Sequence, residues 1–472
     1  MAVSDAVEPA IVADPAPGKL HKQLGTFGCL LLAMSALSPV LSIFGVGSDV
    51  LQHAGSAAAP LFLLGIGVAV VWAVVYAELG SAYPYAGGDY VGVGAILGPW
   101  AGAVTLAIWS ATMGPQVAFQ ARTIATYVHD VLPAAPADVV TLLALAGAVG
   151  VGLMTVRTGA LVTGLFLTIE LIAVVVLTAA GLTHPSHDPQ SIIAHPLVAG
   201  AGGLLIAPTF AALALAGVNT AYATVGGNQA LYFGEELIDP HKRMGRVVLI
   251  ACLVGSVFIA VPVVVVVLGA PDLPAVLRSP APMAAFAAQT LGPAAGKVLS
   301  ACIALAIFNA LIVQIMMGSR LYYSLGRDGV FARPVNRFLD AVDHRSGVPR
   351  RATLALAAFS TGCCFLSAHT LLVFLNGLMV YGWGLVCLAV ILGRLRGKTG
   401  APGYWRAPLG VLAPVLGLIL AAVFTAADIA DADAGRPSLL IMGAIVVAAV
   451  IWSKVVLERR PGGWTPTLVD HA

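Results

Sequence analysis

In the stretch Leu161-Val-Thr-Gly-Leu-Phe-Leu-Thr-Ile-Glu-Leu-Ile-Ala-Val-Val-Val-Leu177, Glu170 is the one ionisable residue of a predominantly apolar run. A helix that crosses a bilayer needs about 17 to 25 mainly apolar residues, and this run has that character. An ionisable side chain at membrane depth is expensive and marks a functional site by default. The run therefore predicts a membrane-spanning helix with a functional carboxyl group in its middle.

The composition of the whole chain extends this prediction. Hydrophobic residues make up 59% of the 472 residues and charged residues only 10%, against about 25% charged in an ordinary soluble protein. We therefore predict an integral membrane protein. Its apolar stretches are continuous and lack the alternating segments of about ten residues that build membrane barrels, which predicts an all-α fold. Twelve spans are expected near residues 26–50, 60–80, 97–128, 139–156, 158–181, 203–237, 247–269, 294–325, 351–367, 370–393, 407–427 and 438–457.

The lysines and arginines predict the orientation of the chain in the membrane. With a cytoplasmic N-terminus and twelve crossings, all but four of the 24 basic residues fall at the inner face, as the positive-inside rule requires. The four exceptions are Arg122, Arg278, Lys297 and Arg436. The first 24 residues lack the pattern of a signal peptide, so the first helix is expected to stay. We predict a multi-pass cell-membrane protein with both termini cytoplasmic.

Two of the expected helices contain residues that break helices. Pro39 interrupts the first, within residues 35–45, because proline removes a backbone donor and obstructs the preceding turn. Gly226 and Gly227 loosen the sixth, within residues 220–229. A packing role explains either feature alone, but breaks five helices apart have the spacing of a five-plus-five inverted repeat. Half-helix N-termini suit an anion and freed carbonyls suit a cation, so the pattern favours a zwitterion such as an amino acid.

Three motifs follow the second, sixth and eighth expected helices. They are Glu78-Leu-Gly-Ser-Ala-Tyr-Pro-Tyr-Ala-Gly-Gly-Asp-Tyr90, then Phe233-Gly-Glu-Glu-Leu-Ile-Asp-Pro-His-Lys-Arg243, and finally Ser319-Arg320 with Gly326-Arg-Asp-Gly-Val-Phe-Ala-Arg-Pro334 and Val348-Pro349. Together they resemble the three inner-loop signatures of the amino acid-polyamine-organocation superfamily of transporters. Three signatures in register across most of the chain make this resemblance specific.

The resemblance implies a leucine-transporter-type fold. Ten core helices form two inverted repeats, two more helices follow, and a bundle rocks against a scaffold to give alternating access. The implied division is a cytoplasmic tail over 1–24, a first repeat over 25–181, an extracellular loop over 182–202, a second repeat over 203–393, helices eleven and twelve within 394–457, and a cytoplasmic tail over 458–472.

The resemblance also implies substrate-binding residues at the two breaks. Val40, Leu41 and Ser42 stand where relatives usually carry a triplet of small residues, so the bulk of Val40 and Leu41 is a departure, although their backbone N–H groups can still face a carboxylate. Tyr222 stands where relatives carry an aromatic residue that covers the substrate; a tyrosine hydrogen-bonded to a neighbour is the alternative. Gly226 matches the glycine of the sixth-helix break. The expected site is completed by Ala223, Thr224, Gly227 and Asn228.

Glu170 occupies a position where many sodium-independent relatives carry a lysine, so the charge is reversed here. A low-dielectric site favours the neutral carboxyl, which lets such a group load and release a proton. We predict that Glu170 couples transport to a proton; a structural glutamate between helices and a direct contact with substrate are the alternatives. Sodium coupling is less favoured, because the middle of residues 300–317 has no pair of Ser or Thr residues at the family's cation site.

Two further groups of polar residues have two explanations each. Trp109, Gln116 and Gln120 share one face of the third expected helix, so they line the permeation path or form hydrogen bonds between packed helices. The charges of the inner-loop motifs form ion pairs that break and re-form during gating, or they are solvated loop charges. The gating hypothesis concerns Glu235, Glu236, Arg320, Arg327 and Asp328.

The remaining patterns narrow the class of function. The chain has no Walker-type run for a nucleotide and no metal-spaced cluster for an enzyme, and a channel would show a repeated filter or charged rings. The six cysteines are expected to be small buried hydrophobes. We predict a secondary transporter that imports an amino acid together with a proton, without enzymatic activity, cofactor, metal or nucleic acid. The alternative is an exchanger of amino acids, amines or organic cations without proton coupling.

Overall fold

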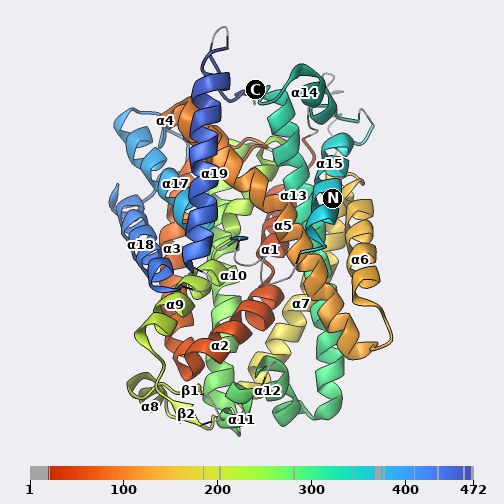
Figure 1. The fold of residues 1–472 in the computed structure, drawn as a ribbon, viewed down its shortest axis with the longest axis vertical. Coiled ribbons are helices and arrows are strands. Elements are labelled where there is room, and N and C mark those ends of the chain that lie inside the picture. Colours follow the sequence, from red (N-terminus) through yellow and green to blue (C-terminus); the bar gives the residue numbers. More distant parts are fainter. Residues whose placement is uncertain are drawn as a thin grey trace, which may run out of the picture.

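The computed structural model describes residues 20, 22–183, 185–200, 204–279, 282–343, 345–366, 371, 374–375, 378–408, 410–432, 435–460 and 463–468. Most of its long helices run along the long axis of the molecule (Figure 1). We call the end that holds two short paired strands the hairpin end, and the opposite end, where the last described residues lie, the tail end. They are at the bottom and the top of Figure 1.

The first expected span is a helix that is interrupted near its middle. Helix α1 (Thr26–Leu37) ends at Ser38, whose left-handed backbone (φ 45°) turns the chain, and Pro39 follows. The chain resumes as a π-helical turn, η1 (Leu41–Gly47), and then as α2 (Ser48–Ala54). The break predicted at Pro39 is therefore confirmed. A π-helical turn inside a helix is rare and often accompanies a functional site.

The sixth expected span is broken as well. Helix α9 (Phe210–Thr224) ends at Val225, which is extended, and the chain continues as a 3₁₀ helix, η4 (Gly227–Glu236). Gly227 packs directly on the next helix, α10 (Pro240–Gly269), since a Cβ added to it would lie only 2.7 Å from backbone atoms of α10. The break predicted at the glycine pair is confirmed, and close packing explains why residue 227 is glycine.

A short helix, a Leu-Gly-Pro tripeptide and a long helix occur twice in the chain. The first copy is α4 (Asp89–Leu97) with α5 (Pro99–Val131), and the second is α12 (Pro282–Leu291) with α13 (Pro293–Arg327). Gly98 and Gly292 have φ of 107° and 92°, a conformation that favours glycine, and the proline after each one begins the long helix. The first joint lies at the tail end and the second at the hairpin end (Figure 1). The two long helices therefore begin at opposite ends of the molecule.

The remaining elements extend between the two ends or cap them. The longer ones are α3 (Ala58–Ala82), α6 (Ala137–Gly152), α7 (Val156–Leu182), α15 (Arg350–Cys363), α17 (Leu378–Leu395), α18 (Leu412–Ala430) and α19 (Gly435–Trp452), which continues as the π-helical turn η5 (Ser453–Leu457). The shorter ones are the 3₁₀ turn η2 (Gly55–Ala57), α8 (Pro189–Ala194), α11 (Leu273–Arg278), α14 (Arg333–Leu339) and the antiparallel strands β1 (Val198–Ala199) and β2 (Leu205–Ile206). Seven helical runs within the described residues are long and apolar enough to cross a membrane. The chain is an essentially all-α membrane protein.

The observed bounds depart from the expected ones in several places. The segment expected to be a loop over 182–202 holds α8 and β1, and the span expected from residue 203 begins only at Phe210 because β2 precedes it. The span expected over 370–393 falls partly on residues outside the described part of the chain. The short helices α4, α11, α12 and α14 were not expected, because fewer than twelve residues carry too little periodicity to distinguish a helix from a loop.

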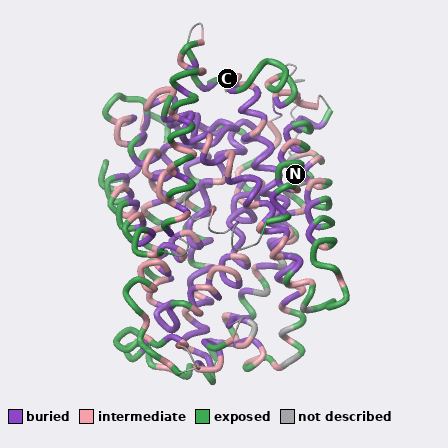
Figure 2. Tube along the Cα trace, viewed as in Figure 1, coloured by how far each residue is buried: buried purple, intermediate pink, exposed green. Residues whose placement is uncertain are grey.

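Burial separates the two faces of the peripheral helices (Figure 2). On α7, Leu161, Leu165 and Ile172 are each more than half exposed, whereas Thr163 and Glu170 are buried. An apolar face toward the outside and polar groups toward other helices are what a lipid-facing helix requires. Glu170 therefore points into the protein.

Candidate functional site

A cavity of about 270 Å³ adjoins both helix breaks. Its wall comes from α1, η1 and α2 on one side, from α9 and the residues after it on another, and from α5 and α17. The expected substrate-binding residues Leu41, Ser42, Tyr222, Gly226 and Asn228 line it. On the hairpin side of the breaks the wall reaches α2 and α9, so the cavity extends from the middle of the molecule toward the hairpin end.

The Val40 and Leu41 N–H groups, which were expected to face a carboxylate, have partners within the protein, and so has the N–H group of Ser42. The Val40 N–H donates to Oε1 of Glu170 at 2.8 Å, and the Leu41 N–H donates to the Ser38 hydroxyl at 3.3 Å. The Ser42 N–H donates to the Ser38 carbonyl at 3.0 Å. Val40 itself is 2% exposed, and the described structure places it behind the cavity wall. In this conformation a carboxylate does lie at the break, but it belongs to Glu170.

Glu170 connects three helices beside the first break. Its Oε2 atom is buried without a hydrogen-bond partner in the described residues, although its Oε1 atom accepts from Val40. The amide of Asn309 in α13 lies close enough to hydrogen-bond with the same carboxyl, and its nitrogen donates to the Ser35 hydroxyl of α1 at 3.2 Å. The Asn309 Oδ1 atom is likewise buried without a partner there. Both atoms are hydrogen-bond acceptors, so a hydrogen bond between them requires a proton on the carboxyl group.

The remaining residues expected at the second break support the cavity from behind. Thr224 donates its hydroxyl to the Gly65 carbonyl of α3 at 3.1 Å, and Gly227 packs on α10. Ala223 is 2% exposed. A Cβ added to Gly226 would lie 2.5 Å from the Leu37 Cδ1 atom at the end of α1. The two breaks therefore touch each other, and these residues hold Tyr222 and Asn228 in the cavity wall.

The polar face of α5 lines the cavity and also contacts other helices. Trp109, Gln116 and Gln120 all line the cavity. Gln116 also accepts a hydrogen bond of 2.8 Å from Gln314 of α13, so one member of the face joins two helices. The Trp109 ring meets the buried Tyr232 ring edge-on, with 6.3 Å between centroids, on the tail side of the cavity.

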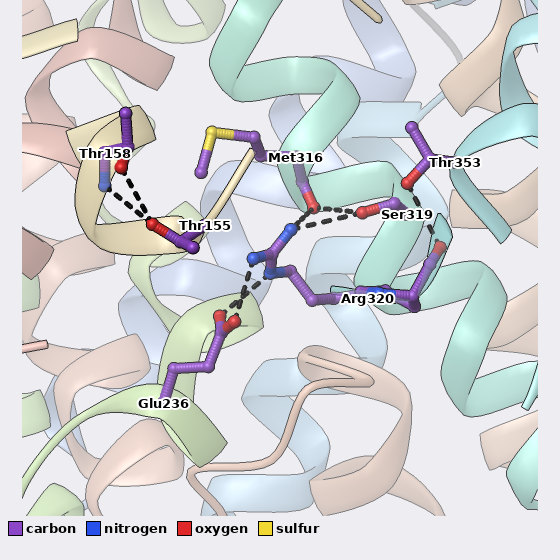
Figure 3. A network of polar contacts seen from close by, with 8 residues as sticks. Thr155, Thr158, Glu236, Met316, Ser319, Arg320 and Thr353 are labelled. Carbon is purple, nitrogen blue, oxygen red and sulfur yellow. Dashed lines mark hydrogen bonds and ion pairs between the residues drawn. The ribbon is translucent and has the colours of Figure 1, made fainter. Parts of the chain in front are cut away.

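An ion pair on the tail side of the cavity joins the second broken helix to α13 (Figure 3). Arg320 donates from Nε and from a terminal nitrogen to the two oxygens of Glu236, at 2.8 Å each, and both side chains are 1% exposed. Arg320 also donates to the Met316 carbonyl at 2.7 Å and lies over the Phe233 ring. A buried pair needs such extra bonds to offset its desolvation.

A second group of charges lies next to this pair. Arg327 donates to Glu235 at 2.5 Å and to Asp328 at 3.1 Å, and Asp328 accepts from the Tyr90 hydroxyl of α4 at 2.7 Å. Glu235 also accepts from the Ala86 N–H at 3.0 Å. We call this group and the Glu236–Arg320 pair the tail-end ion pairs. All of these acidic groups and Arg320 are buried, so the explanation of solvated loop charges is wrong.

Comparison with known proteins agrees with this geometry. The family model for amino acid permeases matches residues 24–452. This chain belongs to the amino acid permease family. The resemblance drawn from the three signatures is thereby confirmed.

Individual relatives of this permease are amino acid transporters by name. It is 27% identical over 398 residues to the Asc-type amino acid transporter 1 of Mus musculus, covering 80% of this chain and 71% of that one. It is 27% identical over 303 residues to the large neutral amino acids transporter small subunit 2 of Homo sapiens, covering 61% and 54%. It is 24% identical over 404 residues to the branched-chain amino acid permease BcaP of Lactococcus lactis subsp. cremoris, covering 80% and 83%.

The permease contains one polar cluster that sequence reasoning missed. Glu78, at the end of α3, forms a buried ion pair with Arg394 of α17 and also accepts from Thr399 at 2.9 Å and from the Ala407 N–H at 2.8 Å. Glu78 begins the first signature, which was the available signal. Its partners lie more than 300 residues away in the chain, and no local pattern relates them.

Proposed function

We propose that this permease is a secondary active transporter that carries an amino acid across the cell membrane by alternating access. The single observation that carries the proposal is the cavity beside two touching helix breaks, one in α1–η1 and one in α9–η4. Backbone groups at breaks of this kind can bind both ends of a zwitterion. At the first break this requires Glu170 and Ser38 to release the N–H groups that they bind in this conformation. The names of the relatives support an amino acid as the solute.

The five-plus-five inverted repeat with twelve spans belongs to this proposal. In that arrangement α3 corresponds to α10 and α5 corresponds to α13, and each pair packs along its length. The Leu-Gly-Pro joints before α5 and α13 lie at opposite ends of the molecule, as inversion requires. The two breaks are the third corresponding pair. We retain the division into repeats over 25–181 and 203–393, joined by 182–202 and followed by the helices within 394–457.

We further propose that the tail end faces the cytoplasm. The basic segment Pro240-His-Lys-Arg243 and the arginines between Arg327 and Arg351 all belong to elements at this end, as the positive-inside rule predicts for a cytoplasmic face. Both terminal segments, 1–24 and 458–472, would then be cytoplasmic. The tail-end ion pairs would form a closed inner gate that must separate when the cavity opens inward.

Glu170 is our candidate for proton coupling. A buried carboxylate needs donors, and the Val40 N–H supplies one to the charged form. In the protonated form, a hydroxyl at Oε2 could donate to the neighbouring Asn309, whose Oδ1 atom is free to accept in the described structure. Protonation would therefore weaken the link from α7 to the first break and strengthen the link from α7 to α13. A change of protonation at this point acts on the break that shapes the cavity.

Uptake into liposomes tests both parts of the proposal. Purified protein would be supplied with pooled labelled amino acids and amines, with and without an inward proton gradient. We expect gradient-stimulated uptake of amino acids that is lost in Glu170→Gln. Glu458→Gln removes a carboxylate that pairs with Lys454 far from the cavity, and it should keep the stimulation.

Two outcomes would contradict the proposal in different ways. If wild type and Glu170→Gln both ignore the gradient and require substrate preloaded inside, the protein is an exchanger of amino acids, amines or organic cations, and coupling through Glu170 is wrong. If no solute in the pool enters the liposomes, the proposal of amino acid transport itself fails.

A further inference from the structure

The cavity has one formally charged side chain among the described residues of its wall, and that residue is Asp49. Asp49 lies in the first turn of α2, on the hairpin side of the first break. It accepts a hydrogen bond of 3.0 Å from the Asn219 amide of α9, and 36% of its side chain remains exposed. Two broken helices thus hold one carboxylate at the cavity, and part of it is open to a ligand.

A second group in the same wall also requires a donor. Gln120 of α5 is 2% exposed, and its Oε1 atom has no hydrogen-bond partner in the described structure. The rings of Trp109, Tyr222 and Trp383 line the same space. A carboxylate, a free amide oxygen and aromatic faces are all groups that attract an ammonium ion.

His53 is the basic residue nearest to Asp49 in the sequence, but it does not occupy the cavity beside Asp49. Its ring approaches Asp49 Oδ1 at 3.3 Å from the next turn of α2, but its side chain is 62% exposed and it is not part of the described wall. The histidine therefore contacts Asp49 from outside the described wall of the cavity.

We propose that Asp49 is a second binding point for an ammonium group, which makes the cavity favour amino acids with a cationic side chain over acidic ones. Asp49 follows Ser42 along η1 and lies in the first turn of α2, so it is farther from the first break than Ser42, toward the hairpin end. A substrate whose backbone amino and carboxyl groups lie at the breaks would thus direct a distal amine toward Asp49. This inference rests on the proposed function and specifies its substrate class.

Two matched amino acids test the inference. L-lysine and L-norleucine have the same four-carbon side chain, to which lysine adds a terminal amine. We expect Asp49→Asn, which keeps an acceptor for Asn219, to raise the KM for lysine about tenfold more than the KM for norleucine, because one charge pair at a partly exposed site is lost. His53→Gln should shift the preference between the two amino acids toward lysine, since it removes the basic side chain that contacts the Asp49 carboxylate. Asp188→Asn, which removes an exposed carboxylate from the N-cap of α8 at the same end, should leave the ratio unchanged.

The outcomes separate this inference from the proposed function. If Asp49→Asn changes the two KM values by the same factor, Asp49 only holds α2 to α9 and the inference is wrong. It is equally wrong if wild type carries norleucine but excludes lysine, and in both cases the proposed function stands. If wild type carries no amino acid at all, the proposed function has failed.

An independent observation concerns the C-terminal segment at the tail end. Trp464 is 3% exposed, and its indole N–H donates to the Asp328 carbonyl at 2.8 Å. Arg460 donates to the carbonyls of Gly329, Val330 and Phe331. Two residues after Trp464, Pro466 packs on α4, since a Cβ added to Gly94 would lie 2.8 Å from its ring. The segment therefore joins α4 to the residues that follow α13.

We infer that this segment is a latch on the tail-end ion pairs. Tyr90 of α4 and Asp328 already meet through a hydrogen bond, and the segment binds residues 328–331 through Trp464 and Arg460 and packs on α4 through Pro466. Any movement that separates α4 from the end of α13 must release either the hydrogen bonds of Trp464 and Arg460 or the packing of Pro466. The latch would therefore slow the opening of the tail end and set the rate of the transport cycle.

Hydrogen exchange of the full-length protein tests the latch. Trp464→Ala should speed amide exchange about tenfold in residues 328–331 and 83–88 and leave the segment 187–199 at the hairpin end unchanged. Trp464→Phe keeps a ring but loses the N–H donor, so its effect should be smaller. Thr465→Ala, at the exposed neighbouring residue, is the control. Unchanged exchange at 328–331, or an equal rise at the hairpin end, would overturn the latch.

Discussion

The two ends of the cavity are held together by different kinds of contact. On the tail side, Glu236–Arg320 and the group around Arg327 are buried charges with several hydrogen bonds each. On the hairpin side, Asn219 of α9 donates a hydrogen bond to the partly exposed Asp49 of α2, and Ser56 and Leu197 exchange hydrogen bonds between neutral groups. Separating the tail end therefore exposes charged groups that are buried as pairs, whereas separating α2 from α9 frees a carboxylate that is already partly exposed. The comparison predicts which substitutions matter.

The largest effect is expected when Arg320 is removed from the tail end. Arg320→Ala removes the guanidinium that pairs with the buried Glu236, which should lower the free energy of unfolding by about 3–5 kcal/mol. Thermal unfolding in detergent would measure it. Lys454→Ala breaks an exposed pair with Glu458 and should change stability by less than about 1 kcal/mol. Equal effects of the two substitutions would show that burial of the pair is not what closes the tail end.

A smaller effect is expected from the second broken helix, where two glycines can be compared. Gly227→Ala forces a Cβ against the backbone of α10 and should cost about 1–3 kcal/mol. Gly217, in the α9 half toward the hairpin end, has no neighbour nearer than 3.9 Å, so Gly217→Ala should be neutral or stabilise by up to about 1 kcal/mol. Chemical or thermal unfolding of the pair distinguishes them. Similar costs at both positions would remove the difference between the two halves.

The hydroxyl of Tyr90 should contribute less than either. Tyr90→Phe removes the 2.7 Å hydrogen bond to Asp328 but keeps the ring and leaves Arg327 on the same carboxylate. We expect a loss of about 1–2 kcal/mol and faster hydrogen exchange in residues 83–88. Tyr322→Phe, which removes a longer bond of 3.3 Å to the Ser110 carbonyl, is the matched control. Faster hydrogen exchange of residues 83–88 in Tyr322→Phe but not in Tyr90→Phe would contradict the contribution assigned to the Tyr90 hydroxyl.

The smallest effect is expected at the hairpin end. Asn219→Ala removes the hydrogen bond between α9 and α2, and because Asp49 stays partly hydrated the cost should be below about 1 kcal/mol. Measuring the unfolding of Asn219→Ala and Arg320→Ala in the same assay compares the contributions of the two ends to stability. A loss as large as that of Arg320→Ala would mean that the hairpin end is closed as firmly as the tail end.

Several features of the site were predictable because they depend on local chemistry. Pro39 and the Gly226–Gly227 pair act on their own helices, so the breaks follow from residue type alone. The charges of the second and third signatures were expected to form ion pairs, and they do. Their burial was not expected. The Leu-Gly-Pro at 97–99 and again at 291–293 is a further local signal, for the starts of two long helices, and it is visible without a structure.

Other features required contacts between distant residues. The partner of Glu170 is the Val40 N–H, 130 positions away, and for this reason the Val40 N–H is occupied although it was expected to face a substrate carboxylate. Asp49 lies only seven residues beyond Ser42, but nothing in its neighbourhood indicates that it faces the cavity. The docking of Trp464 on Asp328 is equally non-local.

The sequence by itself determined the membrane environment, the helical class, the positions of the two breaks and the family, because each depends on composition or on short motifs. Only the tertiary structure decided which groups meet: Glu170 with Val40, Glu236 with Arg320, and Asp49 with the cavity. The physical reason is that backbone preferences act over one or two turns of a helix, whereas the pairing of buried polar groups depends on how whole helices pack.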